Sequence, residues 1–391
     1  MTKVKVLCSY AFLAMALWGC SLDISQAVNT PSAPEIQASL PAPLTPSSNR
    51  PPLRSRIGNP ALPSTAVPVT WDNLNLDGKL VYISSVQSTN SLIFKVQALD
   101  LSDGTITTIF QAPNGAWVDF VSVSPDNTQL VMAYMPPRDD PLSASPGQQA
   151  LYTMPLDGSQ GPRLLLQPPS NGDQYFQPVW SPDGTYVYFS HVDFNAPPKL
   201  QGQRYGYYEI YRMRYPDGGL EKLADQAYWP RLSGDGARLA YVRLSPLDGS
   251  NQLFVANPDG SGAYQVALSG LYVPPIIDAP FFTPDDQSVL YSAVVPTQSL
   301  KPNWIERVFG IRVASAHTVP SDWWSVPIGG GTPIQLTHIA AVGLYASLSP
   351  DRNYIASYSG NGLFLMKPDG TGLTMLVGDT GGLAGSVDWV P

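Results

Sequence analysis

The sequence contains little charge and few histidine or cysteine residues. Of its 391 residues, 13% are charged, 3 are His and 2 are Cys. The formal net charge is −8, and no run of basic residues offsets it. Because binding to phosphates needs a basic face, these features exclude nucleic acid as the expected partner.

Short motifs of common catalytic chemistry are also missing from the sequence. There is no Gly-x-Ser-x-Gly elbow, no paired Cys-x-x-Cys, no His-Glu-x-x-His and no phosphate-binding loop. We therefore expect no catalytic residue and no cofactor, and we favour a binding protein over an enzyme.

Proline and glycine, by contrast, are plentiful, with 40 and 33 residues. Together with the low charge, this composition favours many short strands joined by tight turns over long helices. The sequence therefore predicts an all-β fold.

The first 19 residues have the pattern of a secretory signal peptide, with Lys3 and Lys5 followed by an apolar stretch. The tetrapeptide Leu-Trp-Gly-Cys that ends at Cys20 resembles the lipobox of bacterial lipoproteins. This resemblance implies cleavage before Cys20, lipid on that residue, and an extracytoplasmic protein anchored to a bacterial membrane. Cys8 would be removed with the signal, so the mature chain would form no internal disulfide. Plain secretion, with Cys20 incidental, is the alternative.

Residues 20–67 are rich in Pro, Ser, Ala and Thr and poor in aromatic residues. Such a segment cannot bury enough apolar surface to fold, so its composition predicts disorder. We interpret it as a tether between the membrane and a folded domain at residues 68–391.

A strand-turn-strand unit recurs after Trp71. Its clearest copy runs from Val179 through Trp180-Ser181-Pro182-Asp183-Gly184 into a second apolar strand. A second hairpin with an Asp-Gly or Gly-rich turn follows each first one, as at Asp217-Gly218. Two hairpins make four strands, so six copies predict a six-bladed β-propeller of four-stranded antiparallel blades. The Asp residues of the first turns are Asp77, Asp126, Asp183, Asp235, Asp285 and Asp351, at intervals of 49 to 66 residues.

Through Trp180–Gly184 and its weaker copies, residues 71–391 resemble the TolB-like propellers built from WD40-like (PD40) repeats. The resemblance implies the same fold and, for function, a scaffold of the cell envelope that binds a protein or another ligand. Ser386–Pro391 looks like a first strand that lacks its turn. We predict that it pairs with the first blade and closes the ring.

The repeated acidic turn residues have two interpretations, catalytic or structural. Asp in a tight turn usually accepts hydrogen bonds from the backbone nearby, which stabilises the reversal of the chain. We therefore predict a structural role for Asp126, Asp183, Asp235, Asp285 and Asp351.

Both sets of hairpin turns should lie on one side of the ring, which we call the turn face. The opposite side, the insertion face, then carries the loops from strand two to strand three and the links between blades. All three long insertions, at 135–149, 192–207 and 294–321, fall on the insertion face. Long loops held by a rigid scaffold are frequent binding elements.

Aromatic residues on the insertion face are the predicted binding residues. One interpretation is that they only pack between blades. The other is an aromatic-rimmed funnel at the mouth of the channel, which would take a peptide, a glycan or a loop of an envelope protein. The candidates are Trp117, Phe176, Trp229, Trp304, Phe309 and Tyr345.

The three histidines, His191, His317 and His338, are all predicted to lie toward the insertion face. If they converged they could hold a divalent metal, as in pectin-cleaving lyases that resemble this repeat. A metal-dependent carbohydrate-active enzyme is therefore the alternative function. Isolated histidines are more often surface or packing residues, so we expect no metal.

Overall fold

The computed structural model describes the predicted propeller region and not the segments before it. The predicted signal peptide, Cys20 and nearly all of the predicted tether lie outside the described residues, as do Trp304, Phe309 and His317. The described residues are 67–391 except 72–73, 75, 88–91, 138–147, 197–205, 248–249, 271–272, 275, 295–319, 379 and 381–384.

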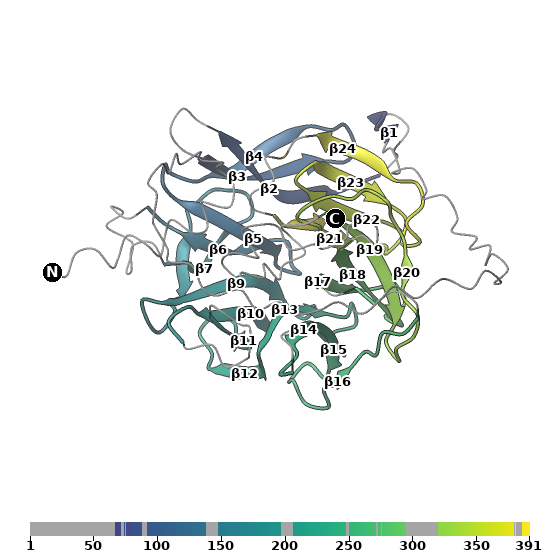
Figure 1. Ribbon diagram of the computed structural model, residues 1–391. Coiled ribbons are helices and arrows are strands. Elements are labelled where there is room, and N and C mark those ends of the chain that lie inside the picture. Colours follow the sequence, from purple (N-terminus) through teal and green to yellow (C-terminus); the bar gives the residue numbers. More distant parts are fainter. Residues whose placement is uncertain are drawn as a thin grey trace, which may run out of the picture. The chain divides into compact units, whose positions relative to one another are not determined.

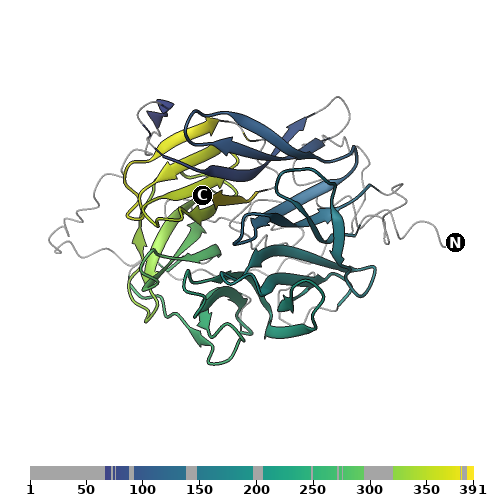
Figure 2. The ribbon, with the colours of Figure 1, turned by 180° about the vertical axis from the view of Figure 1, so that it is seen from behind.

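Six four-stranded antiparallel sheets form a ring of blades, which confirms the predicted fold class (Figures 1 and 2). Each innermost strand contacts the innermost strand of the next blade, and the last contacts the first. Among the described residues no helix is long and apolar enough to cross a bilayer.

The blades are numbered in chain order, and their strands are given from the innermost to the outermost. Blade 1 is β25 (Val387–Val390), β2 (Lys79–Gln87), β3 (Leu92–Asp100) and β4 (Ile106–Gln111); blade 2 is β5 (Trp117–Val123), β6 (Gln129–Met135), β7 (Ala150–Pro155) and β8 (Arg163–Leu166); blade 3 is β9 (Asp173–Trp180), β10 (Tyr186–Asp193), β11 (Tyr207–Arg214) and β12 (Leu220–Asp225). Blade 4 is β13 (Ala227–Leu232), β14 (Leu239–Leu244), β15 (Asn251–Ala256) and β16 (Tyr264–Gln265); blade 5 is β17 (Ile277–Phe282), β18 (Ser288–Val294), β19 (Ser321–Pro327) and β20 (Ile334–Gln335); blade 6 is β21 (Tyr345–Leu348), β22 (Ile355–Ser359), β23 (Gly362–Met366) and β24 (Thr374–Gly378).

The ring closes through the last strand of the chain. Strand β25 pairs antiparallel with β2, with Val390 opposite Lys79 and Val387 opposite Tyr82. The predicted closure is therefore confirmed. At the outer edge of blade 6, the short strand β1 (Val67–Pro68) pairs parallel with β24.

Asp388 of β25 also joins blade 1 to the blades on both sides. Its Oδ2 accepts hydrogen bonds from Val123 N at 2.8 Å and from Ser122 Oγ at 3.2 Å, both in blade 2. Its Oδ1 accepts one from Ser347 Oγ of blade 6 at 3.0 Å. One carboxylate thus ties the closing strand to both neighbours.

The core lies between the blades, because each sheet packs face to face on the next. The second strands are buried along almost their whole length, as in β6 and β18, whereas the outermost strands β8 and β12 are largely exposed. Large side chains such as Trp323 and Tyr188 are fully buried between sheets. Apolar burial on both sheet faces provides the main driving force for this packing.

Candidate functional site

Four of the six innermost strands carry the same backbone irregularity close to the axis of the ring. Phe120, Gln177, Trp229 and Ala279 have positive φ angles of 48° to 62°. Beside each of them the strand pairing shifts by one residue, which is a β-bulge. The pairing of β21 and β25 continues without such a shift. A bulge changes the direction in which the neighbouring side chains point, and all four of these residues line the space near the axis.

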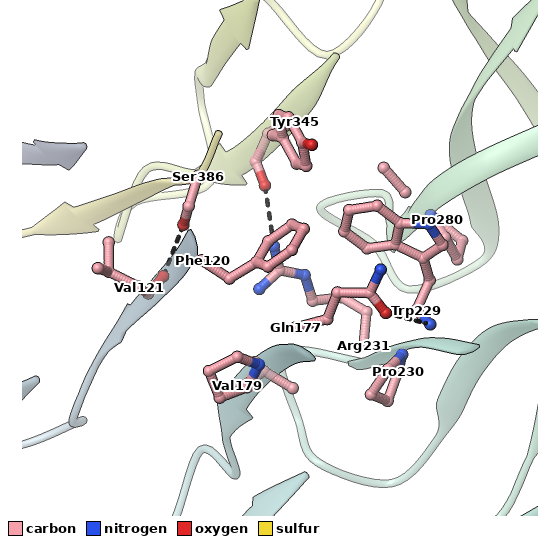
Figure 3. Close-up of a pocket in the computed structure, with 13 residues that line it drawn as sticks. Phe120, Val121, Gln177, Val179, Trp229, Pro230, Arg231, Pro280, Tyr345 and Ser386 are labelled. Atoms are coloured by element: carbon pink, nitrogen blue, oxygen red, sulfur yellow. Dashed lines mark hydrogen bonds between the residues drawn. The ribbon is translucent and has the colours of Figure 1, made fainter. Parts of the chain in front are cut away.

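Residues of the innermost strands line a small pocket near the axis, shown in Figure 3, which we call the axial channel. The open space within it is about 20 Å³, which is room for roughly one water molecule. Of its described lining residues, only Arg231 is charged. The lining residues are Phe120, Val121, Gln177, Pro178, Val179, Trp229, Pro230, Arg231, Ala279, Pro280, Tyr345, Ala346 and Ser386.

Three aromatic rings from alternate blades meet in the channel, and we call them the aromatic plug: Phe120 of blade 2, Trp229 of blade 4 and Tyr345 of blade 6. The ring centroids are 5.1 Å apart for Phe120 and Trp229, 5.5 Å for Phe120 and Tyr345, and 5.4 Å for Trp229 and Tyr345. Gly385 lies so close to Tyr345 that a Cβ would clash with its ring.

Asp119 is half-buried directly before the bulge of blade 2. Burial raises the pKa of Asp119 to about 7, although hydrogen bonds from Trp117 and from the backbone of Gly385 and Phe120 act against the increase. Burial, followed by the negative charge of Asp119, raises the pKa of Tyr345 well above its usual value. The site therefore combines aromatic rings with a carboxyl group that titrates near neutral pH.

The predicted aromatic residues do not all lie in one place. Trp229 is 7% exposed, and together with Tyr345 it belongs to the aromatic plug. Trp117 lies against Phe94 of blade 1, with ring centroids 4.5 Å apart, and Phe176 is half-buried against the core. Two candidates therefore meet on the axis, while the other two described ones lie at blade contacts.

The two described histidines lie in different blades and have separate partners. In blade 3, His191 Nδ1 is 3.0 Å from Glu209 Oε2, and its Nε2 is 3.4 Å from Asp173 Oδ2. In blade 5, His338 Nδ1 accepts a hydrogen bond from Gln335 Nε2 at 3.0 Å. Because the carboxylates lie on opposite sides of the His191 ring, they cannot share one ion with it. No group of three or more His, Cys, Asp or Glu residues in the described parts of the chain could hold a metal ion.

The turn residues share one hydrogen-bond pattern. Asp183 Oδ1, for example, accepts hydrogen bonds from Ser181 Oγ at 2.6 Å and from Thr185 N at 3.0 Å. The bond from the Ser or Thr hydroxyl is the largest cause that lowers the pKa of these carboxyl groups. The same two contacts occur at Asp126, Asp235, Asp285 and Asp351.

Sequence reasoning missed Phe120, Gln177 and Arg231, which contribute as much to the channel as the predicted residues do. One signal could have identified Gln177 and Arg231, which each lie next to a proline. Pro178, Pro230 and Pro280 each precede the turn Asp of their blade by the same number of residues. Because proline is confined to bulges and edges of sheets, this repeat marks an irregular point in three of the innermost strands.

The described residues thus define a closed six-bladed β-propeller with a narrow axial channel. No protein-family model matches the sequence, and no curated protein is significantly similar to it. Among solved structures, TolB from Acinetobacter baumannii is similar over 80% of this chain and 67% of its own, with a TM-score of 0.55 and 16% identity. Hydrazine synthase from Kuenenia stuttgartiensis matches 81% of this chain and 47% of its own, with a TM-score of 0.55 and 11% identity.

A nidogen/laminin complex is similar over 80% of this chain and 98% of the matched chain, with a TM-score of 0.51 and 8% identity. Such identities show a shared fold and do not transfer a function. The chain therefore has a TolB-like six-bladed β-propeller fold.

Proposed function

We propose that this chain is a membrane-anchored extracytoplasmic lipoprotein whose propeller is a non-catalytic binding scaffold. Its partner is an envelope protein, a peptide or a glycan, held at the insertion face. The observation that carries this proposal is topological. The long connections from β6 to β7, from β10 to β11 and from β18 to β19 all leave the ring at the same face. A rigid ring that presents several long loops on one side is a common arrangement for binding.

Half-buried aromatic groups near this face add contact area. Phe176 is partly exposed, and so are Tyr208 and Tyr228, whose ring centroids are 5.5 Å apart. Aromatic side chains contribute much of the binding energy of protein interfaces because they bury large areas with little loss of conformational freedom. These residues supply the propeller's part of the proposed binding surface, and Trp304 and Phe309 supply that of the third insertion.

The binding proposal is tested by capture from the native envelope, with the mature lipoprotein as bait. Phe176→Ala and Trp304→Ala are expected to weaken capture of the bound partner at least about tenfold, as for residues at the centre of an interface. Tyr264→Ala is the matched control, because Tyr264 is 42% exposed on the outermost strand of blade 4. Equal capture by all three variants at unchanged melting temperatures would contradict the proposal.

The anchoring proposal rests on the tetrapeptide that ends at Cys20. Two or more acyl chains hold a protein stably at a bilayer, at about 0.8 kcal/mol for each buried CH₂ group. We expect the wild-type chain in the membrane fraction of its native host and Cys20→Ala in the soluble fraction. Labelling with a fatty-acid analogue measures the modification directly. A wild-type protein that is secreted without label would establish plain secretion instead.

A further inference from the structure

Arg231 is the charged residue that lines the axial channel, and it is poorly satisfied. It lies near the end of β13 in blade 4 and is half-buried, so solvent reaches part of it. Figure 3 shows its side chain extending beside Phe120 toward the backbone of β21, where Nη2 donates a hydrogen bond to Ala346 O at 3.3 Å. A guanidinium carries five N–H donors. Within the described residues this is its one hydrogen bond, and no carboxylate oxygen lies within 4.0 Å of its nitrogens.

The side-chain oxygens of Gln177 and Ser386 in the channel are already paired. Gln177 Oε1 accepts hydrogen bonds from Ser190 Oγ at 2.6 Å and from Trp229 N at 3.0 Å. Ser386 Oγ donates to Val121 O at 2.6 Å. Much of the remaining lining is apolar, including three prolines. Among the described residues, the guanidinium and Gln177 Nε2 therefore carry side-chain donors of the channel that lack a partner, and of these two groups the guanidinium is the charged one.

Asp388 is the carboxylate whose charge acts on Arg231, but it does not neutralise it through contact. Burial lowers the pKa of Arg231, and the charge of Asp388 acts against this effect. The Asp388 oxygens are already occupied by donors from blades 2 and 6 and by Trp389 N at 3.0 Å. A half-buried guanidinium without a carboxylate in contact keeps its charge and most of its N–H groups available to an opposite charge.

We propose that Arg231 is the receptor in the channel for a carboxylate carried by the binding partner. The planar fork of a guanidinium matches a carboxylate through two parallel N–H···O bonds. The open space beside the aromatic plug is about 20 Å³, so a carboxylate takes the place of water there and the neighbouring side chains move to admit it. This inference rests on the proposed binding function and adds the chemical class that is recognised.

The test compares two short capped peptides, Gly-Ser-Glu-Ser-Gly and its Gln counterpart, by calorimetric titration against the full mature chain. The Glu peptide is expected to bind wild type at least about tenfold more tightly than the Gln peptide, because a desolvated charge pair forms with one of them only. Arg231→Met should reduce binding of the Glu peptide to the level of the Gln peptide. Arg231→Lys should retain part of the preference, because an ammonium attracts a carboxylate without the two-bond geometry.

Arg163→Met is the matched control, because Arg163 is exposed on the outer strand β8 of blade 2 and should not affect either peptide. Equal affinity of wild type for both peptides would overturn the carboxylate proposal while leaving the binding function in place. Binding of neither peptide would also overturn it. If Arg231→Met melts at a lower temperature but still distinguishes the peptides as wild type does, Arg231 only links blades 4 and 6. If Arg231→Met does not fold, the peptide preference of Arg231→Lys decides, and an unchanged preference would reject the proposal.

Discussion

The turns of this propeller repeat the same residue types from blade to blade, whereas the axis repeats a backbone conformation. At the turns, five blades repeat the same residue type and the same two hydrogen bonds, as at Asp126 and Asp183. At the axis, the four bulges repeat the same backbone conformation, but their side chains are Phe, Gln, Trp and Ala. Repeated side chains thus fix the turns, whereas at the axis a repeated backbone conformation carries side chains of different size and polarity.

Blades 6 and 1 differ from the others because the ring closes between them. Their innermost strands β21 and β25 have no bulge, and they carry the Ser347–Asp388 hydrogen bond of 3.0 Å. Regular pairing gives β25 its full set of ladder bonds with β2. Where the ring closes, the two innermost strands therefore keep regular pairing and have no bulge.

Deletion of residues 387–391 should have the largest effect, because it removes the innermost strand of blade 1 and the Asp388 contacts together. We expect the melting temperature to fall by about 10 °C or more, since several kcal/mol of burial and pairing are lost. Calorimetry measures the change. An unchanged melting temperature would reject closure by β25.

Trp229→Ala should have the next largest effect, since it removes one of the three rings of the aromatic plug. Truncation of a buried Trp costs about 3 to 5 kcal/mol. Ala279→Gly, at the equivalent bulge of blade 5, is the control. It removes one methyl group at a φ of 48° and should change the free energy of unfolding by less than about 1 kcal/mol. Denaturant titration compares the two, and similar effects would show that the rings are not a structural plug.

Asp119 should give the channel a pH dependence that the turns do not have. Its pKa is raised to about 7 in the folded state, so the folded state holds the proton more tightly than the unfolded chain does. The free energy of unfolding therefore falls as pH rises from about 4 to about 7. Asp119→Asn should remove this fall, at most about 4 kcal/mol for a pKa raised from 3.8 to about 7, in denaturant titrations from pH 4 to 8. If variant and wild type have the same pH dependence, Asp119 is not the group responsible.

Asp183→Asn should have the smallest effect, because it weakens two hydrogen bonds at an exposed turn. We expect a loss of less than about 1 kcal/mol and no change in partner binding. The pKa of Asp183 is lowered in the folded state, first by the hydrogen bond from Ser181. The difference from wild type should therefore be present at neutral pH and disappear as pH falls through that lowered pKa. Loss of binding by this variant would favour a functional role for the turns.

Local patterns were enough to predict the blades, and they were not enough to predict the channel. Each turn such as Ser181–Gly184 specifies its own hairpin through contacts between residues close in sequence. Trp229 and Tyr345 were predicted as an open funnel or as packing residues, and the structure places both beside Phe120. These rings come from three blades. Each precedes the turn Asp of its blade by six residues, which places the three at one level of the ring, but only the closed ring brings alternate blades into contact. The loop residues Trp304 and Phe309 remain predictions.

The sequence by itself determined the repeated hairpins, their number and the pairing of the last strand with the first blade. These features depend on turn chemistry and on alternating apolar residues, which act over a few positions. Only the tertiary structure decided that Phe120, Trp229 and Tyr345 meet on the axis and that no carboxylate of the described residues lies within 4.0 Å of Arg231. The physical reason is that closing a ring brings six distant strands within reach of one another, and the bulges then set which side chains point inward.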